Sequence, residues 1–284
     1  MDPVPARIGV AGDWHGNTGW AVRAIRRICA QLPASGPRIV LHLGDFGIWP
    51  DRGGTEFLAR ADAALAQAGA QLWFIDGNHE DHGMLARLTP GPDGRSPVTA
   101  RIWHLPRGYR WQWHGRRWLA LGGAVSLDRA ERTAGRDWFE EEEISAAQAA
   151  AAVASGRADV LVSHDCPAGI KHAFTAVPPA WSRADVARSE RHRERLAGVA
   201  AAVRPAVLLH GHLHEYYQRT VDLGWGPVTV TGLDCDNAQQ GNWGILDAAS
   251  LRWERLHGQL LASLARNLAR RAGPGAGQHA ARRR

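Results

Sequence analysis

The sequence has 284 residues, of which 45% are hydrophobic and 22% charged, so it excludes a disordered or fibrous chain. Its formal net charge is +6, but six arginines follow Ala262 without an accompanying acid. The rest of the chain has 28 basic and 28 acidic residues and is therefore neutral. This charge balance argues against a dedicated nucleic-acid-binding protein.

The three cysteines, Cys29, Cys166 and Cys235, are far apart and odd in number. This pattern excludes a disulfide framework and favours a reducing compartment. No apolar run approaches the 18 residues of a membrane-spanning helix, and the first residues lack the pattern of a signal peptide. We therefore expect a cytoplasmic protein with no membrane attachment and no obligate protein partner.

Short apolar runs, each followed by glycine or polar residues, recur along the chain and predict strands that are covered on both faces. Apolar residues at helical spacing predict helices over 20–32 and 57–68, between the first three strands. This strand–helix–strand alternation is typical of βαβ units. The predicted strands are Arg7–Ala11, Arg38–Leu43, Gln71–Ile75, Trp118–Leu121, Asp159–Val162, Ala206–Leu209, Val228–Thr231 and Trp243–Leu246.

The middle and the end of the chain are less regular. Residues 90–101 are rich in Gly and Pro and predict a loop, whereas aromatic and polar residues alternate over 101–118 and predict a hairpin. We further expect helices over 140–153 and 185–203, a long loop over 167–183, and a hairpin over 246–256 that turns at 247–250. A single domain over 1–260 would then be followed at 261–284 by a helix end and a basic flexible tail.

Residues that bind metals follow five of these predicted strands, which is where α/β sheets place their functional sites. Oxygen and imidazole ligands without thiolates favour Mn, Fe, Zn or similar divalent ions. An Asp-x-His or His-x-His spacing puts two ligands on the same side of an extended segment. The five segments are Gly12-Asp13-Trp14-His15-Gly16, Gly44-Asp45, Gly77-Asn78-His79-Glu80, Ser163-His164-Asp165 and Gly211-His212-Leu213-His214.

The order of these segments resembles that of the calcineurin-like metallophosphoesterase superfamily. The resemblance implies a four-layer α/β/β/α sandwich with two mixed sheets and a site for two divalent ions, Mn first and Fe, Zn, Ni or Mg as alternatives. It implies that Asp45 bridges the two ions. One ion would be held by Asp13, His15, Asp45 and His214, and the other by Asp45, Asn78, His164 and His212.

The resemblance also implies a reaction. The enzyme would hydrolyse a phosphomonoester or a phosphodiester, and a metal-activated hydroxide would attack phosphorus in line with the leaving group. His79 would not be a ligand. It would face the phosphate ester as a general acid or stabilise the charge of the leaving group.

The expected support for His79 departs from the family pattern. Many members carry an acid three residues after the bridging Asp, and this chain has Ile48 there. Two alternatives remain: an insertion has moved the acid to Asp51, or Glu80 supports the histidine instead. Further candidates for contacts with the substrate are three basic residues, Arg52, Lys171 and His172.

Two other functions are compatible with the same motifs. One is a nuclease of the same superfamily, for which the arginine tail would supply weak, non-specific affinity for nucleic acid. The other is a non-catalytic metal-binding scaffold, although such members typically lose ligands or the catalytic histidine, and both are intact here.

Overall fold

The computed structural model describes residues 4–171 and 181–254, and every structural feature below belongs to these two stretches. The predicted boundary at residue 260, the tail over 261–284 and His172 lie outside them. The described residues contain no helix that is both long and apolar enough to span a membrane.

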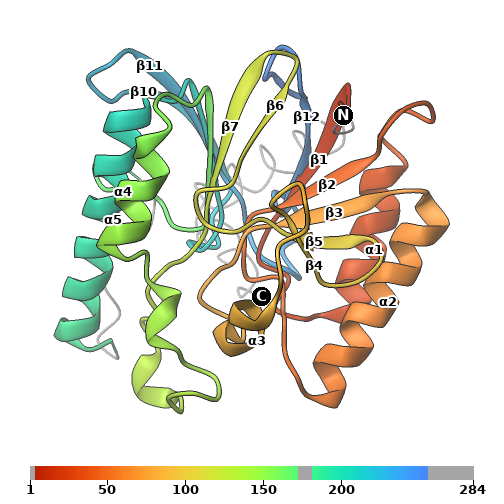
Figure 1. Cartoon of the computed structure of the whole chain (residues 1–284), viewed down its shortest axis with the longest axis horizontal. Coiled ribbons are helices and arrows are strands. Elements are labelled where there is room, and N and C mark those ends of the chain that lie inside the picture. Colours follow the sequence, from red (N-terminus) through yellow and green to blue (C-terminus); the bar gives the residue numbers. More distant parts are fainter. Residues whose placement is uncertain (1–3, 172–180, 255–284) are drawn as a thin grey trace, which may run out of the picture. The chain divides into compact units, whose positions relative to one another are not determined.

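The strands form two mixed sheets (Figure 1). In the first, β1, β2, β3 and β5 are parallel, β12 pairs antiparallel with β1, and β4 pairs antiparallel with β5. This sheet contains β1 (Arg7–Ala11), β2 (Ile39–His42), β3 (Gln71–Phe74), β4 (Ser96–Pro97), β5 (Ile102–His104), β12 (Trp243–Asp247) and β13 (Trp253–Glu254). Its order is β13-β12-β1-β2-β3-β5-β4.

The second sheet has parallel strands at its centre and antiparallel strands at both edges. Its order is β10-β11-β9-β8-β7-β6, with β6 and β10 as the antiparallel edge strands. Four parallel neighbours lie between them. The sheet contains β6 (Arg110–Trp113), β7 (Arg116–Leu121), β8 (Val160–Ser163), β9 (Val207–His210), β10 (Tyr217–Asp222) and β11 (Pro227–Gly232).

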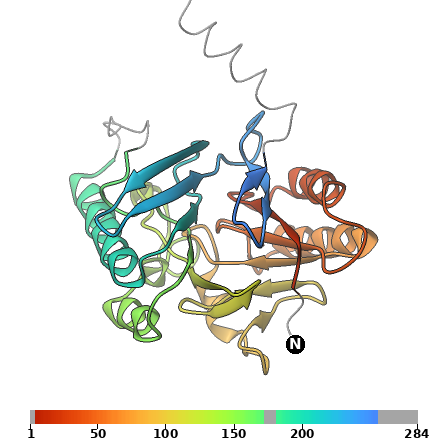
Figure 2. The same ribbon diagram turned by 90° about the horizontal axis from the view of Figure 1, so that it is seen from above.

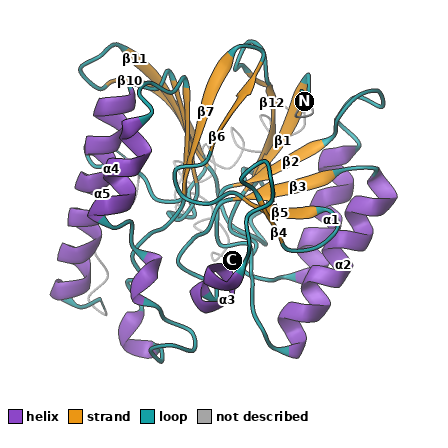
Figure 3. Cartoon of the chain, in the orientation of Figure 1, coloured by secondary structure: helices purple, strands orange, loops and turns teal. Residues whose placement is uncertain are grey.

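Helices cover the outer face of each sheet. α1 (Thr18–Cys29) and α2 (Arg52–Ala68) lie against the first sheet, where the Ile28 side chain fills the space over Gly9 of β1. α4 (Ala146–Ala154) and α5 (Arg183–Val203) pack on the second sheet (Figures 2 and 3). The order helix, sheet, sheet, helix confirms the predicted four-layer sandwich.

The two sheets enclose a core that is rich in tryptophan. Side chains from β1, β2 and β3 meet side chains from β6, β7, β8 and β9 in one buried cluster. The rings of Trp111 and Trp118 stack with their centroids 5.5 Å apart, and Trp73 lies 5.2 Å from Trp113. Because buried aromatic rings remove a large apolar area from water, this cluster holds the sheets together face to face.

The helix predicted over 140–153 begins later than its acidic residues indicate. Ser145 caps the helix through a capping box with Gln148, and α4 starts at Ala146. The segment Glu140–Glu142 forms a separate 3₁₀ turn, and the Glu142 side chain is buried. The prediction was wrong here because these acids were assigned to the first helical turn, whereas Glu142 has hydrogen-bond partners elsewhere in the fold.

Two strands and one α-helix have no counterpart among the predictions, and one of these strands, β4, lies inside the loop predicted over 90–101. β10 is an edge strand in which exposed residues alternate with residues that are buried or partly buried, so it lacks the continuous apolar run of a central strand. α3 (His82–Arg87) has six residues and begins at Asp81, whose side chain accepts a hydrogen bond from the Met84 amide. A helix this short does not establish an apolar period.

Candidate metal centre

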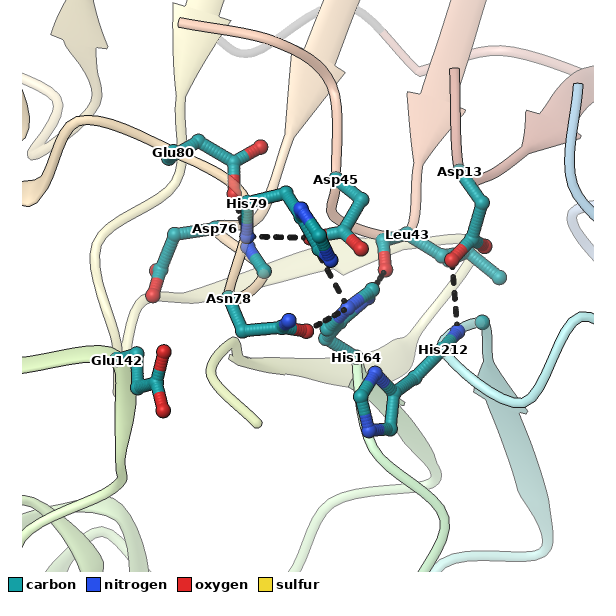
Figure 4. A network of polar contacts seen from close by, with 12 residues as sticks. Asp13, Leu43, Asp45, Asp76, Asn78, His79, Glu80, Glu142, His164 and His212 are labelled. Atoms are coloured by element: carbon teal, nitrogen blue, oxygen red, sulfur yellow. Dashed lines mark hydrogen bonds and ion pairs between the residues drawn. The ribbon is translucent and has the colours of Figure 1, made fainter. Parts of the chain in front are cut away.

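The five polar segments meet at one end of the two sheets. They follow β1, β2, β3, β8 and β9 at the carboxyl ends of these strands (Figure 4). Backbone hydrogen bonds join neighbouring segments. The Asp13 amide donates to the Gly44 carbonyl over 3.1 Å, the His15 amide to Asp45 over 2.8 Å, and the Gly211 amide to His164 over 3.0 Å. The loops therefore form one connected rim.

This rim carries two overlapping clusters of ligand atoms. Asp13, His15, Asp45 and His214 offer atoms that all lie within 4.8 Å of one another, and so do Asp45, His164 and His212. The Asn78 side-chain oxygen joins the second cluster, since it lies 3.2 Å from His164 Nε2. The Asp45 oxygens lie 3.4 Å from His15 Nε2 and 3.3 Å from His164 Nε2. One carboxylate therefore faces both clusters.

The chemistry of these clusters fits two divalent cations. Asp13 and Asp45 are buried, and Asp13 Oδ2 has no hydrogen-bond partner among the described residues. A buried carboxylate oxygen without a partner is costly unless a cation or a donor compensates it. Imidazole and carboxylate ligands without thiolate suit Mn, Fe or Zn, so these residues could hold the two ions that the sequence predicts.

The backbone of the ligand loops is locally strained. Five of the candidate ligands have positive φ angles: 58° at Asp13, 47° at His15, 52° at Asp45, 64° at His212 and 49° at His214. Residues other than glycine seldom adopt this conformation, and it persists where the surrounding structure imposes it, often at functional sites. The fold thus accepts a conformational cost in order to turn these side chains toward one another.

Two glycines leave the room that the carboxylates occupy. A methyl group added at Gly77 would collide with Asp45 Oδ1, and one added at Gly211 would collide with Asp13 Oδ2. The glycines at these two positions therefore serve close approach rather than a tight turn.

The carboxylate of Asp45 raises the pKa of two of the candidate histidine ligands. Burial lowers the pKa of His15, but the hydrogen bond to Asp45 and the charge of this carboxylate raise it to about 9. Burial also opposes protonation of His164, yet the charge of Asp45 and their hydrogen bond raise its pKa to about 10. Burial alone dominates at His212 and lowers its pKa to about 4. Because metals bind neutral imidazole, metal binding must displace the protons of His15 and His164.

Partners beyond the ligands set the direction of the rings. His15 Nδ1 lies 3.2 Å from an Asp236 oxygen, and the other Asp236 oxygen accepts a 2.6 Å hydrogen bond from Asn17. His164 Nδ1 lies 2.7 Å from the Leu43 carbonyl oxygen, to which it donates. In both rings Nε2 is thereby directed at Asp45, which is the usual arrangement of metal-binding histidines.

The Asn78 amide is held by a buried relay. Its nitrogen donates to the Ser126 hydroxyl over 3.1 Å, and this hydroxyl donates to Glu142 over 2.6 Å. Glu142 also accepts hydrogen bonds from the Ser126 amide at 2.8 Å and from Trp138 Nε1 at 3.0 Å. The relay orients the amide of Asn78 so that its oxygen, the atom able to bind a metal, faces His164.

We expect Ser126→Ala to lower the affinity of the centre for Mn²⁺ by about 10- to 100-fold, because the amide of Asn78 loses the acceptor that orients it. Titration of metal-free protein with Mn²⁺ measures the change. Ser155→Ala is the control, since Ser155 is exposed at the end of α4. Equal Mn²⁺ affinity in both variants would show that Ser126 does not position the ligand.

Glu142 makes the stability of the fold depend on pH. Burial raises its pKa from an ordinary 4.5 to about 7, although its hydrogen bonds with Ser126 oppose the change. Between these two pH values the folded chain binds more protons at this side chain than the unfolded chain, so stability falls as pH rises. Glu142→Gln removes this dependence on pH. The free energy of unfolding of the variant, relative to that of the wild type, should therefore rise by about 1 to 3 kcal/mol from about pH 5 to about pH 8.

Urea denaturation of the metal-free protein at several pH values measures this difference. Glu141→Gln is the matched control, because Glu141 is the exposed neighbour. Parallel stability profiles for wild type and Glu142→Gln would contradict the prediction.

Neither acid considered as a support for His79 contacts its ring through a hydrogen bond in the described structure. Asp51 caps α2 by accepting from the Gly54 amide over 2.7 Å. Glu80 accepts hydrogen bonds from the amides of Phe46 and Gly77 and so braces the loops that carry Asp45 and Asn78. The neighbour of the His79 ring is Arg132, whose Nη2 lies 2.7 Å from Nδ1 and 2.9 Å from Nε2.

A pocket of about 520 Å³ opens beside the clusters. The described residues that line it come from the rim, from the segment after β7 and from α5 with its preceding turn. Arg52 and Lys171 are exposed and are not among these residues. Their role in substrate binding stays a prediction. The lining residues are Asp45, Asn78, His79, Leu127, Asp128, Trp181, Val186, Ser189, Glu190, Arg193, His212, Leu213 and His214.

Sequence analysis missed Arg132, Asp128, Ser126 and Asp236 as neighbours of the site. The first three lie in an irregular segment between β7 and α4, where no strand end or motif marks them. A weaker signal marks Asp236, which lies five residues after the predicted strand Val228–Thr231, whereas the first ligand after each of the other strands lies two or three residues beyond it.

Comparison with known proteins agrees with this geometry. Residues 6–216, well over half of the chain, match the family described as calcineurin-like phosphoesterase. The chain belongs to this family. Comparison with curated proteins found no match.

Two solved structures are similar to this chain at low sequence identity. The structure of the Thermus thermophilus protein TT1561 is 12% identical, has a TM-score of 0.51, and the match covers 88% of this chain and 98% of that one. A conserved uncharacterized protein from Streptococcus pneumoniae, described as a predicted phosphoesterase, is 12% identical with a TM-score of 0.31, and the match covers 87% of this chain and 83% of that one. At this identity the likeness to TT1561 supports the fold alone.

Proposed function

We propose that this protein is a dinuclear metal-dependent phosphoesterase that hydrolyses a phosphomonoester or a phosphodiester. The observation that carries the proposal is the position of Asp45, whose two oxygens face separate ligand clusters. One ion would be held by Asp13, His15, Asp45 and His214, and the other by Asp45, Asn78, His164 and His212. Mn²⁺ is the first choice of metal.

The bound ions would activate water and neutralise charge on the phosphoryl group. The protein's own side chains would do the rest. His79 lines the pocket beside Asp45, and its backbone amide donates to Asp45 over 2.8 Å, so the loop that carries the ring is tied to the centre. From there His79 would give a proton to the leaving oxygen or stabilise its charge.

The free thiols of Cys29, Cys166 and Cys235 are consistent with a reducing, cytoplasmic location.

A hydrolysis panel tests the function. It compares an aryl phosphomonoester, an aryl phosphodiester, cyclic nucleotides and single-stranded DNA, each with Mn²⁺ and after chelation. We expect turnover of an aryl ester that disappears on chelation and returns with Mn²⁺. Single-stranded DNA as the preferred substrate would favour a nuclease. An intact metal-loaded protein with no turnover of any substrate would favour the non-catalytic scaffold.

A further inference from the structure

The side chain of Arg132 reaches the centre from an irregular segment. This segment, residues 122–145, runs from the end of β7 to the cap of α4. Its Asp128 lines the same pocket as His79. Arg132 Nη2 donates to Asp128 over 2.6 Å and lies next to both nitrogens of the His79 ring. An arginine that the family motifs do not include therefore stands beside the predicted catalytic histidine.

The segment is anchored well enough to hold this side chain in place. The Arg132 side chain is 11% exposed, and its Nη1 donates to the Asp137 carbonyl over 3.1 Å. The guanidinium carbon of Arg129 lies over the Trp138 ring, 4.3 Å from the ring centroid. The guanidinium carbon of Arg188, which belongs to α5, lies 5.6 Å from the same centroid. The segment thus contacts α5, a helix whose residues also line the pocket.

One N–H group of the Arg132 guanidinium is available to bind a ligand. Arg132 Nε is buried and has no hydrogen-bond partner among the described residues. Nε and Nη2 form one edge of the guanidinium, and such an edge binds two oxygens of a carboxylate or phosphate. Of these two nitrogens, Nη2 lies beside the His79 ring. Arg132 itself is not among the residues that line the pocket, but its Nη2 contacts His79 and Asp128, which are. The buried Nε, without a partner among the described residues, lies on the same edge of the guanidinium as Nη2.

Several donor groups converge at this position. The ring of His15 lies 5.3 Å from that of His79 in an edge-on arrangement. Two basic rings and a guanidinium converge here, with Asp128 as the carboxylate paired to Arg132. A tetrahedral oxyanion would meet donors on several sides.

We propose that Arg132 is a catalytic residue that binds the phosphoryl oxygens of the substrate together with His79. The inference rests on the proposed function, because it assigns a residue to the same centre. Asp128 is a positioning residue that holds the guanidinium at the pocket. The arginine takes no part in metal binding, since its charge repels cations.

The test measures binding of inorganic phosphate to the Mn²⁺-loaded protein by calorimetry, alongside turnover of an aryl phosphomonoester. Arg132→Ala should weaken phosphate binding at least tenfold and lower kcat/KM by about 100-fold, with the Mn²⁺ content unchanged. Arg132→Lys should recover part of the phosphate affinity, because it restores the charge but not the planar edge. Arg136→Ala is the matched control. Arg136 lies in the same segment with its side chain 77% exposed, and this variant should behave as wild type.

Two results would overturn the inference. One is phosphate affinity within twofold of wild type in Arg132→Ala, and the other is loss of Mn²⁺ from this variant. Phosphate binding does not require turnover, so the result for Arg132 is independent of the hydrolysis panel. If the wild type binds phosphate through Arg132 but hydrolyses nothing, the proposed function fails and the binding role stands. If it hydrolyses esters and Arg132→Ala matches it, only the role of Arg132 fails.

Discussion

Asp45→Asn is expected to abolish hydrolysis, with turnover reduced by at least about 1,000-fold, and to leave the centre with less than two ions per chain. Asp45 is 1% exposed and is the one carboxylate whose oxygens face both clusters. Its replacement by an uncharged amide removes half of the carboxylate charge that the two clusters supply. Elemental analysis of the dialysed protein and turnover of an aryl phosphate measure the two effects.

The matched control for this variant is Asp51→Asn, six residues further along the chain. Asp51 is exposed and caps α2, and asparagine is as good an N-cap as aspartate. It should keep both metal content and turnover. Full activity of Asp45→Asn after exhaustive chelation would exclude the two-metal centre.

His79→Ala should lower turnover by about 100- to 10,000-fold while both ions stay bound. The imidazole lies beside the pocket and beside Arg132, and only its backbone amide contacts Asp45. The loss should be smaller for p-nitrophenyl phosphate than for an alkyl phosphate, because p-nitrophenolate needs little protonation when it leaves. Turnover of the two esters and the Mn²⁺ content of the variant measure this.

His114→Ala serves as the control histidine, since His114 is exposed in the turn between β6 and β7 and contacts the Pro5 carbonyl. It should match the wild type on both esters. Loss of the metal from His79→Ala, or equal losses on both esters, would contradict the role as a proton donor.

Most of the strands, and the meeting of the polar segments that follow them, could be predicted because both depend on short patterns. Buried parallel strands are continuous apolar runs, and the residue that follows each run lies at the same edge of its sheet. For this reason Asp13, Asp45 and His164 come together although the sequence separates them widely. The alternation that marks a half-exposed edge strand is weaker, and β10 was missed on that account.

The partners of the ligands could not be predicted, because their position depends on tertiary packing. Ser126 and Glu142 meet Asn78 only after the segment beyond β7 folds back over the rim. Nothing in the local pattern distinguishes Glu142 from Glu141 and Glu143, yet it is buried and they are not fully so. The sequence indicates Asp51 or Glu80 as the support of His79, whereas the ring lies next to Arg132, which is 53 residues away in the chain.

Each cluster of ligands takes members from both sheets. Asp13, His15 and Asp45 follow strands of the first sheet, and His164, together with the pair after β9, follows strands of the second. An ion in either cluster would therefore join the two sheets, and metal binding would be linked to folding. At a free ion concentration 100 times its dissociation constant, one bound ion adds about 2.7 kcal/mol to the free energy of unfolding. If the proposed ions bind, a greater supply of metal would let the chain stay folded despite more destabilising substitutions in its tryptophan-rich core.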